Sequence, residues 1–239
     1  MPIWMRPERP ARGPQPSHSR AEIVATAIRI ADAEGIDGLS MRRLAAEVGA
    51  GTMSLYRYIP RKDDLYELMV DAVAGEEPLP AEPSGDWRAD LRMLAHRQLT
   101  SARRHPWQAL MGGRPVFGPN TLRVTEFQFA VLDGLGLTID GMLEITFALG
   151  AFIGGVVQNE LAAGEMRRRT GVDEQQWQRA NIPYVRQIVD SGEFPYTSRI
   201  IMDAEIPHTD PDTVFDRVLE RFLDGLSAGI PGETSPHPS

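Results

Sequence analysis

The chain has 239 residues, of which 42% are hydrophobic, and it carries a formal net charge of −8 at pH 7. This length and apolar content suit one large domain, or a small module joined to a larger one, with a packed core. The sequence contains no cysteine, which excludes disulfides and thiolate metal sites. We find no apolar run long enough for a signal peptide or a membrane span, so we expect a cytoplasmic protein with no membrane partner.

Residues 1–18 combine five prolines with three arginines, a composition that cannot bury a core. We therefore expect a disordered segment of positive charge. A basic arm of this kind can reach into the minor groove beside a DNA-reading domain. A plain disordered tail is the other interpretation.

From Ser19 to Ala74, apolar residues recur at three- and four-residue spacing, which predicts four helices around one small core. Gly49 ends the second of these helices, and Pro60 stops the third. The expected helices are Ser19–Glu34, Ser40–Val48, Thr52–Tyr58 and Lys62–Val73.

The second and third helices, with the short turn between them, have helix-turn-helix spacing. Leu55 and Ile59, at i and i+4, are the expected inward anchors of the third helix. Its remaining side chains then face outward, and they carry groups that can bond phosphates or base edges. Lys62, at the start of the fourth helix, can meet a phosphate beside free N–H groups. The side chains that this pattern turns toward DNA are Thr52, Met53, Ser54, Tyr56, Arg57, Tyr58 and Lys62.

The charge of this stretch also favours DNA. Between Ser40 and Lys62 there are five basic residues and one acidic residue, a local charge of +4 in a chain of net −8. The alternative is a helical hairpin whose arginines are simply solvated.

Three motifs carry a resemblance to a known family. The pattern L-S-x-R-x-L-A-x-x-x-G spans Leu39–Gly49, L-Y-x-[YHF] spans Leu55–Tyr58, and Lys62 opens the fourth helix. Together with the glycine loop that precedes them, these motifs resemble the TetR family of transcriptional regulators, over about residues 18–74. The resemblance implies that Arg42 faces operator DNA together with Thr52, Ser54 and Tyr56. It also implies a homodimer whose late helices form a four-helix bundle between subunits.

A break rich in proline and acids, Gly75–Gly85, is the candidate boundary of the DNA-reading module. The later residues again read as helical, so we expect an all-α fold in which residues 19–74 read DNA and residues 86–228 form a larger domain. Residues 229–239 are expected to be a disordered tail. A short turn is expected near Trp107–Met111, and Pro183 is expected to break one helix. The expected later helices are Asp86–Arg104, Asn120–Leu135, Ile139–Met166, Asp173–Asp190 and Pro211–Ala228.

The helix expected at Ile139–Met166 is apolar nearly all round in its middle, so it must be covered on more than one side. Gly154 and the glycines near it would let another backbone approach closely. Pro211–Ala228 offers a second apolar surface. We expect a homodimer through these two helices, because a helix-turn-helix reader generally needs two half-sites. Packing inside the core of one subunit is the alternative.

Polar side chains interrupt several stripes that should be buried, and a buried amide needs partners. A bond to neighbouring backbone explains any single one. Several together, with aromatic residues on adjoining segments, are more typical of a largely apolar cavity with a few orienting groups. The expected ligand contacts are Gln98, Trp107, Phe127, Gln128, Thr146, Gln158, Trp177 and Tyr184.

The sequence offers no catalytic or metal motif. The histidines are scattered, and zinc-binding H-E-x-x-H, phosphate-loop and G-x-S-x-G patterns are missing. We therefore predict no enzyme and no cofactor. The expected function is ligand-responsive transcriptional repression, with double-stranded operator DNA and a small-molecule effector as partners. The competing class is a helical small-molecule carrier or an enzyme with an incidental helix-turn-helix resemblance.

Overall fold

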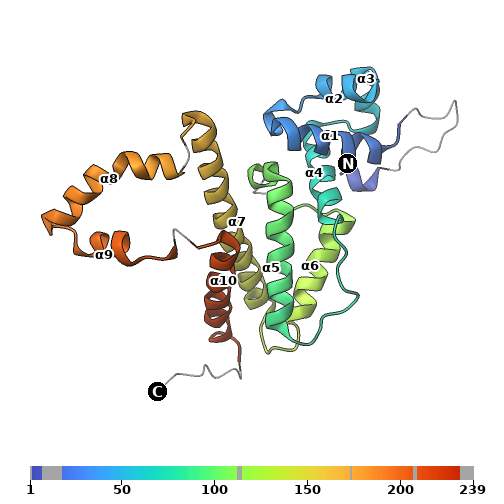
Figure 1. Ribbon diagram of the computed structural model, residues 1–239. Coiled ribbons are helices and arrows are strands. Elements are labelled where there is room, and N and C mark those ends of the chain that lie inside the picture. The colour runs from blue at the N-terminus through green and yellow to red at the C-terminus, as the bar shows by residue number, and fades with distance from the viewer. Residues whose placement is uncertain (1, 7–17, 112–114, 173, 207–208, 232–239) are drawn as a thin grey trace. The chain divides into compact units, whose positions relative to one another are not determined.

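The computed structural model describes residues 2–6, 18–111, 115–172, 174–206 and 209–231, and these residues are all-helical (Figure 1). They form ten α-helices and short 3-10 helices, with no strand among them. The chain divides into two compact units, Met1–Val157 and Gln158–Ser239. The division falls inside a helix, and the domain boundary predicted at residues 75–85 stays a prediction.

The first unit begins with the four helices expected from the sequence. Each starts and ends within one or two residues of its predicted bounds. Ser19 caps the first helix: its hydroxyl accepts from the Glu22 N–H at 3.1 Å, and the Glu22 carboxylate accepts from the Ser19 N–H at 2.7 Å. The helices are α1 (Arg20–Glu34), α2 (Met41–Val48), α3 (Thr52–Tyr58) and α4 (Lys62–Ala74), with η2 (Ile36–Gly38) between the first two.

Two segments outside these helices complete their core. Ile3, in η1 (Ile3–Met5), is fully buried in it, and the indole N–H of Trp4 donates to Glu67 Oε2 at 3.1 Å. Trp107 is buried in the same core. The prediction that all of residues 1–18 are disordered is therefore wrong for Ile3–Met5, because an apolar side chain there finds a place in the core. The predicted minor-groove arm falls largely on residues 7–17, outside the described residues.

Three further helices follow in the first unit, and α5 and α6 lie side by side (Figure 1). Asp86 caps α5, accepting from the Ala89 N–H at 3.0 Å. The elements are α5 (Trp87–Arg104), η3 (Pro106–Leu110), α6 (Pro119–Leu132) and the first part of α7 (Ile139–Thr170).

One buried carboxylate joins α4 to α6. Asp71 of α4 accepts from the backbone N–H groups of Asn120 and Thr121, both at 2.9 Å, and from the Thr121 hydroxyl at 3.2 Å. Asp71 thus caps the first turn of α6 from another helix. A Cβ at Gly118 would collide with this carboxylate, so glycine is required there.

The second unit contains the end of α7 and three more helices. They are α8 (Glu174–Ser191), α9 (Pro195–Asp203) and α10 (Pro211–Ser227), and α8 contacts α9. Asp210 caps α10, accepting from the Thr213 N–H at 3.0 Å. Pro183 lies inside α8, so the prediction that it breaks that helix is wrong. Proline removes one N–H donor, and the turns on either side keep their own bonds. Helix α9 was not predicted.

Helix α7 has 32 residues, four more than expected, because it continues to Thr170. By length and composition it is apolar enough to cross a membrane, and it is the only such helix within the described parts of the chain. The expectation that no apolar run is long enough is therefore wrong. Core helices of globular proteins pass the same test, so this observation alone is weak evidence for a membrane span.

Candidate DNA-binding surface and ligand cavity

The turn between α2 and α3 is fixed by backbone geometry. Gly49 has φ +70°, in the left-handed region that glycine adopts without strain. The next N–H, of Ala50, donates to the Ala45 carbonyl at 2.9 Å and closes the end of α2. Leu55 and Ile59 are buried, with 1% and 0% of their surface exposed. The structure therefore anchors α3 by the two residues that the sequence predicted.

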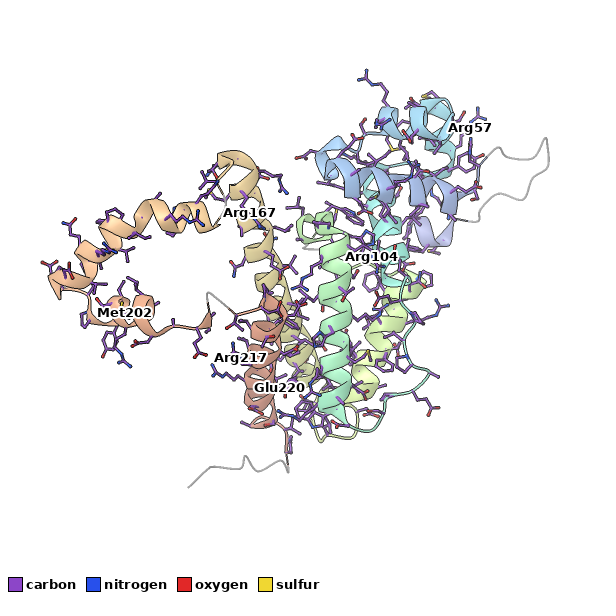
Figure 2. The ribbon with its side chains drawn as sticks, viewed as in Figure 1. Arg57, Arg104, Arg167, Met202, Arg217 and Glu220 are labelled. Atoms are coloured by element: carbon purple, nitrogen blue, oxygen red, sulfur yellow. The ribbon has the colours of Figure 1, made fainter. Side chains whose placement is uncertain are left out.

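The other side chains of α3 meet solvent to different degrees. Met53 is 78% exposed and Tyr56 41% exposed, and Ser54 and Arg57 are exposed as well. Arg57 is labelled on this surface in Figure 2. Thr52 and Tyr58 are half-buried, and Tyr58 packs against the core of the module. The exposed part of α3 thus offers a thioether, hydroxyls and a guanidinium.

Ion pairs sort the basic residues of this module into two groups. Arg43 bonds Glu47 at 2.7 Å and Glu34 at 3.1 Å, and Arg61 bonds Asp64 at 3.2 Å. Hydrogen bonds from Arg29 and the charge of Arg43 hold the pKa of Glu47 below its usual value. These arginines are already neutralised within the module.

Arg42, Arg57 and Lys62 form the second group. All three are exposed, and none has an ion pair within the described residues. Lys62 lies 5.2 Å from the centre of the Tyr66 ring, a cation–π contact that leaves its charge uncompensated. The three cations without acid partners, called the free cations below, belong to α2, α3 and the start of α4.

A cavity of about 400 Å³ lies within the first unit, walled by α5, α6, η3 and the first part of α7. Its volume falls in the range of small-molecule sites. Gln98 and Gln128, both expected ligand contacts, line it. Gly154 lines it as well, and a Cβ there would meet nothing within 4 Å. In the structure this glycine leaves room in the cavity, and its predicted role in a dimer contact stays a prediction.

Two predicted contacts lie elsewhere in the first unit. Trp107 is 2% exposed and its indole N–H donates to Asp32 Oδ1 at 2.7 Å, so the prediction that it faces a ligand is wrong. The sequence pattern could not distinguish a tryptophan that fills a core from one that lines a cavity. Phe127 is buried and lines a second hollow of about 800 Å³ beneath residues 77–83.

The other four predicted contacts do not line the cavity. The Thr146 hydroxyl donates to the Met142 carbonyl at 2.9 Å, which is the backbone bond weighed as the alternative for such residues. Gln158 belongs to the second unit. Trp177 and Tyr184, on α8, are 58% and 62% exposed. Their role in ligand binding stays a prediction.

The cavity wall also contains residues that the sequence did not single out, namely Arg97, Ser101, Gln108, Thr121 and Thr125. Arg97 and Ser101 lie on α5, where the sequence pattern indicates solvent-exposed positions. Gln108 lies in η3, where no helical stripe marked it as inward. The only signal that could have predicted these wall residues is the order of α5 and α6 along the chain, which makes them antiparallel neighbours.

The cavity and the DNA-reading module share a junction of polar groups around one buried histidine. His105, only 3% exposed, lies between Asp32 of α1 at 2.8 Å and Glu76 at 3.0 Å. Arg104, labelled in Figure 2, also bonds Glu76 at 3.1 Å. Because both ring nitrogens meet carboxylates, η3 is tied to α1 and to the end of α4. Gln108 of the cavity wall is three residues from this junction.

A helix-turn-helix with free cations, followed by helices that wall a partly open cavity, defines a DNA-binding regulator. Two family models match the chain: "Bacterial regulatory proteins, tetR family" over residues 23–69 and "Tetracyclin repressor-like, C-terminal domain" over residues 79–230. The chain belongs to the TetR family of transcriptional regulators. The predicted family and all-α fold are confirmed.

Relatives extend the match over the whole chain. The HTH-type transcriptional repressor DrrR1 of Streptomyces coeruleorubidus is 37% identical, over 98% of this chain and 87% of that protein. The class A tetracycline repressor of Escherichia coli is 23% identical, over 86% of this chain and 88% of that one. The structure of Streptomyces coelicolor ActR with actinorhodin has TM-score 0.69 and 26% identity, covering 89% of this chain and 98% of ActR.

Proposed function

We propose that this chain is a homodimeric repressor that binds an operator through α2 and α3 and leaves it when a small molecule enters the cavity. On this proposal, residues 19–74 read DNA and residues 86–228 bind the ligand and dimerise. The free cations are the observation that carries the proposal. A hairpin that only supported the fold would have no need of uncompensated charge on its exposed side, whereas a DNA backbone supplies the missing anions.

The proposed DNA contacts follow from the chemistry of each side chain. Arg42 can donate two bonds to a guanine, worth about 1–3 kcal/mol of discrimination between bases. Tyr56 and Lys62 are proposed phosphate contacts, since a phosphate near Lys62 also meets the free N–H groups that begin α4. The full proposed set is Arg42, Thr52, Met53, Ser54, Tyr56, Arg57, Tyr58 and Lys62.

An exposed stripe on α7 supports the proposed homodimer. Ile139, Leu143 and Phe147, spaced by four residues, are 62%, 51% and 79% exposed. The opposite side of the same helix carries the buried residues Ile145 and Leu149. An apolar stripe on one side of a helix requires a cover. We propose a second copy of the chain as that cover, with α7 and α10 at the interface, because members of this family act as dimers.

The small-molecule step rests on the cavity. ActR has been solved with actinorhodin bound and with (S)-DNPA bound. We propose that the cavity of this chain takes a small molecule too, with Gln98 and Gln128 as orienting groups. Ligand binding must favour a conformer whose recognition helices are misplaced for DNA. A ligand with equal affinity for this conformer and for the DNA-binding one would not shift the equilibrium between them.

The test is gel retardation of the DNA upstream of the gene, at moderate salt, with two matched variants. Arg57→Ala removes a free cation, whereas Arg43→Ala removes one that Glu34 and Glu47 already neutralise. We expect Arg57→Ala to weaken binding by about 1 kcal/mol or more, and Arg43→Ala to weaken it less. A parent protein that fails to retard this DNA, or equal losses in both variants, would count against the proposal.

A further inference from the structure

The cavity wall is unbalanced in charge. Among the described residues that line it, Arg97 is the only one with an ionisable side chain. The remaining polar residues are neutral amides and hydroxyls that can donate or accept. The neutral polar lining consists of Gln98, Ser101, Gln108, Thr121, Thr125 and Gln128.

Arg97 has no carboxylate partner within the described residues. Its Nε donates to the Glu77 carbonyl at 3.3 Å, and its Nη2 donates to the carbonyls of Glu77, at 2.8 Å, and Ala74. The nearest acid, the Glu77 side chain, lies 3.5 Å from Arg104 instead. Nη1 has no hydrogen-bond partner among the described residues and is not a buried atom. Two of the five guanidinium N–H groups therefore remain available.

This arrangement is costly without an anion. Burial lowers the pKa of Arg97 from its ordinary value, and the charge of Glu77 opposes the shift. A partly buried cation regains stability when an anion joins it, and the planar guanidinium fits a carboxylate or sulfonate. Three backbone bonds explain how Arg97 supports the end of α4. They do not explain why the charge lines a cavity.

The second hollow, which Arg97 also lines, differs in charge. It contains three acids, Glu77, Glu82 and Glu126, and only one other arginine, Arg123. An organic anion would meet net negative charge there and net positive charge in the 400 Å³ cavity. The two hollows therefore differ in the ligand they favour.

We propose that the effector is an organic anion whose carboxylate, sulfonate or phenolate group is bound by Arg97, with the neutral amides and hydroxyls placing its uncharged part. This inference rests on the proposed function and names the chemical class of its ligand. Because Arg97 also holds Ala74, the last residue of α4, an anion that draws on Arg97 acts on the helix that follows the DNA reader.

The test uses two probes that differ by one anionic group, 1-anilinonaphthalene-8-sulfonate and its uncharged parent N-phenyl-1-naphthylamine. Each is titrated into the full-length protein and followed by fluorescence. Arg97→Gln should raise the Kd of the sulfonate by about tenfold or more, the loss expected for a charge-assisted hydrogen bond. The Kd of the neutral probe should change by less than about threefold.

Matched variants locate the effect. Arg123→Gln removes the same charge from the neighbouring hollow and should change neither Kd. Gln128→Glu places a carboxylate in the cavity wall without touching the bonds of Arg97 to α4, so it should weaken only the sulfonate. Gly154→Leu fills the cavity and should weaken both probes. If Arg97→Gln fails to fold, Gln128→Glu decides the question.

Three results would overturn the inference: equal losses for both probes in Arg97→Gln, no loss for the sulfonate in either Arg97→Gln or Gln128→Glu, or the same loss in Arg123→Gln. Retardation of the upstream DNA separates this failure from failure of the proposed function. If both probes release the DNA equally well, the proposed regulatory function is supported and the proposed role of Arg97 is refuted. If the parent does not bind DNA, the proposed regulatory function is refuted, and the titrations still decide whether Arg97 binds an anion.

Discussion

Replacing Asp71 should separate the DNA-reading helices from the cavity. Asp71 is 5% exposed, and its carboxylate accepts two backbone N–H bonds, one hydroxyl bond and one side-chain amide bond from the first turn of α6. Asp71→Ala leaves these donors buried and without their acceptor. Loss of a helix cap costs about 0.5–2 kcal/mol, and loss of a charged acceptor costs about 1.5–3 kcal/mol. Because these costs overlap, we expect about 2–4 kcal/mol of lost stability.

The assay is urea unfolding together with thermal unfolding. For a chain of this size each kcal/mol lowers Tm by about 2–4 °C, so Asp71→Ala should lower it by about 4–16 °C. Asp133→Ala is the matched control, because this exposed acid at the far end of α6 has no side-chain bond in the described structure. Its effect should stay within about 0.5 kcal/mol. If both variants lose equally little, the cap from α4 to α6 does not hold the two helices together.

Three more outcomes are expected. Trp107→Phe removes the indole donor to Asp32 and should cost about 1–2 kcal/mol in urea unfolding; an unchanged midpoint would contradict the bond. Phe147→Asp puts a charge on the exposed α7 stripe and should yield a folded monomer by light scattering, whereas an intact dimer would exclude that interface. Hydrogen bonds from His105 and Arg104 outweigh burial and keep the pKa of Glu76 below 4.5, its ordinary value. The ionised Glu76 carboxylate therefore stabilises the fold above about pH 4.5, and this stabilisation is lost below that pH. Glu76→Gln should make the free energy of unfolding fall less steeply as the pH is lowered into the acid range; an unchanged slope would contradict this.

The sequence was most informative where local chemistry decides the structure. Ser19 and Gly49 mark helix ends because a capping oxygen or a left-handed glycine acts within a few residues. Leu55 and Ile59 were found as anchors because four-residue spacing selects one side of a helix. These features need no knowledge of distant parts of the chain.

Contacts between distant segments were harder to predict. Trp107 fills a core built about seventy residues earlier in the chain, and Ile3 joins the same core from a proline-rich segment. Arg97 was missed because an arginine beside an apolar stripe usually extends into solvent. Its carbonyl partners are Ala74, at the end of α4, and Glu77, in the turn that follows; no periodicity in α5 reveals them. Gln98 and Gln128 were found because amides at apolar helical spacing are unusual, although Gln98 is exposed in the structure.

The ion pairs of the DNA-reading module set how its binding should respond to salt. Arg43 and Arg61 already pair with carboxylates of their own chain, so they would not release condensed counterions from a DNA strand. Arg42 is assigned to a guanine, so among the described free cations Arg57 and Lys62 would displace counterions from DNA phosphates. At about 0.9 ions per contact, these two give a slope of about −1.8 per module in log K against log salt. Two modules in a dimer would give about −3.6, a moderate dependence that leaves much of the affinity to uncharged contacts.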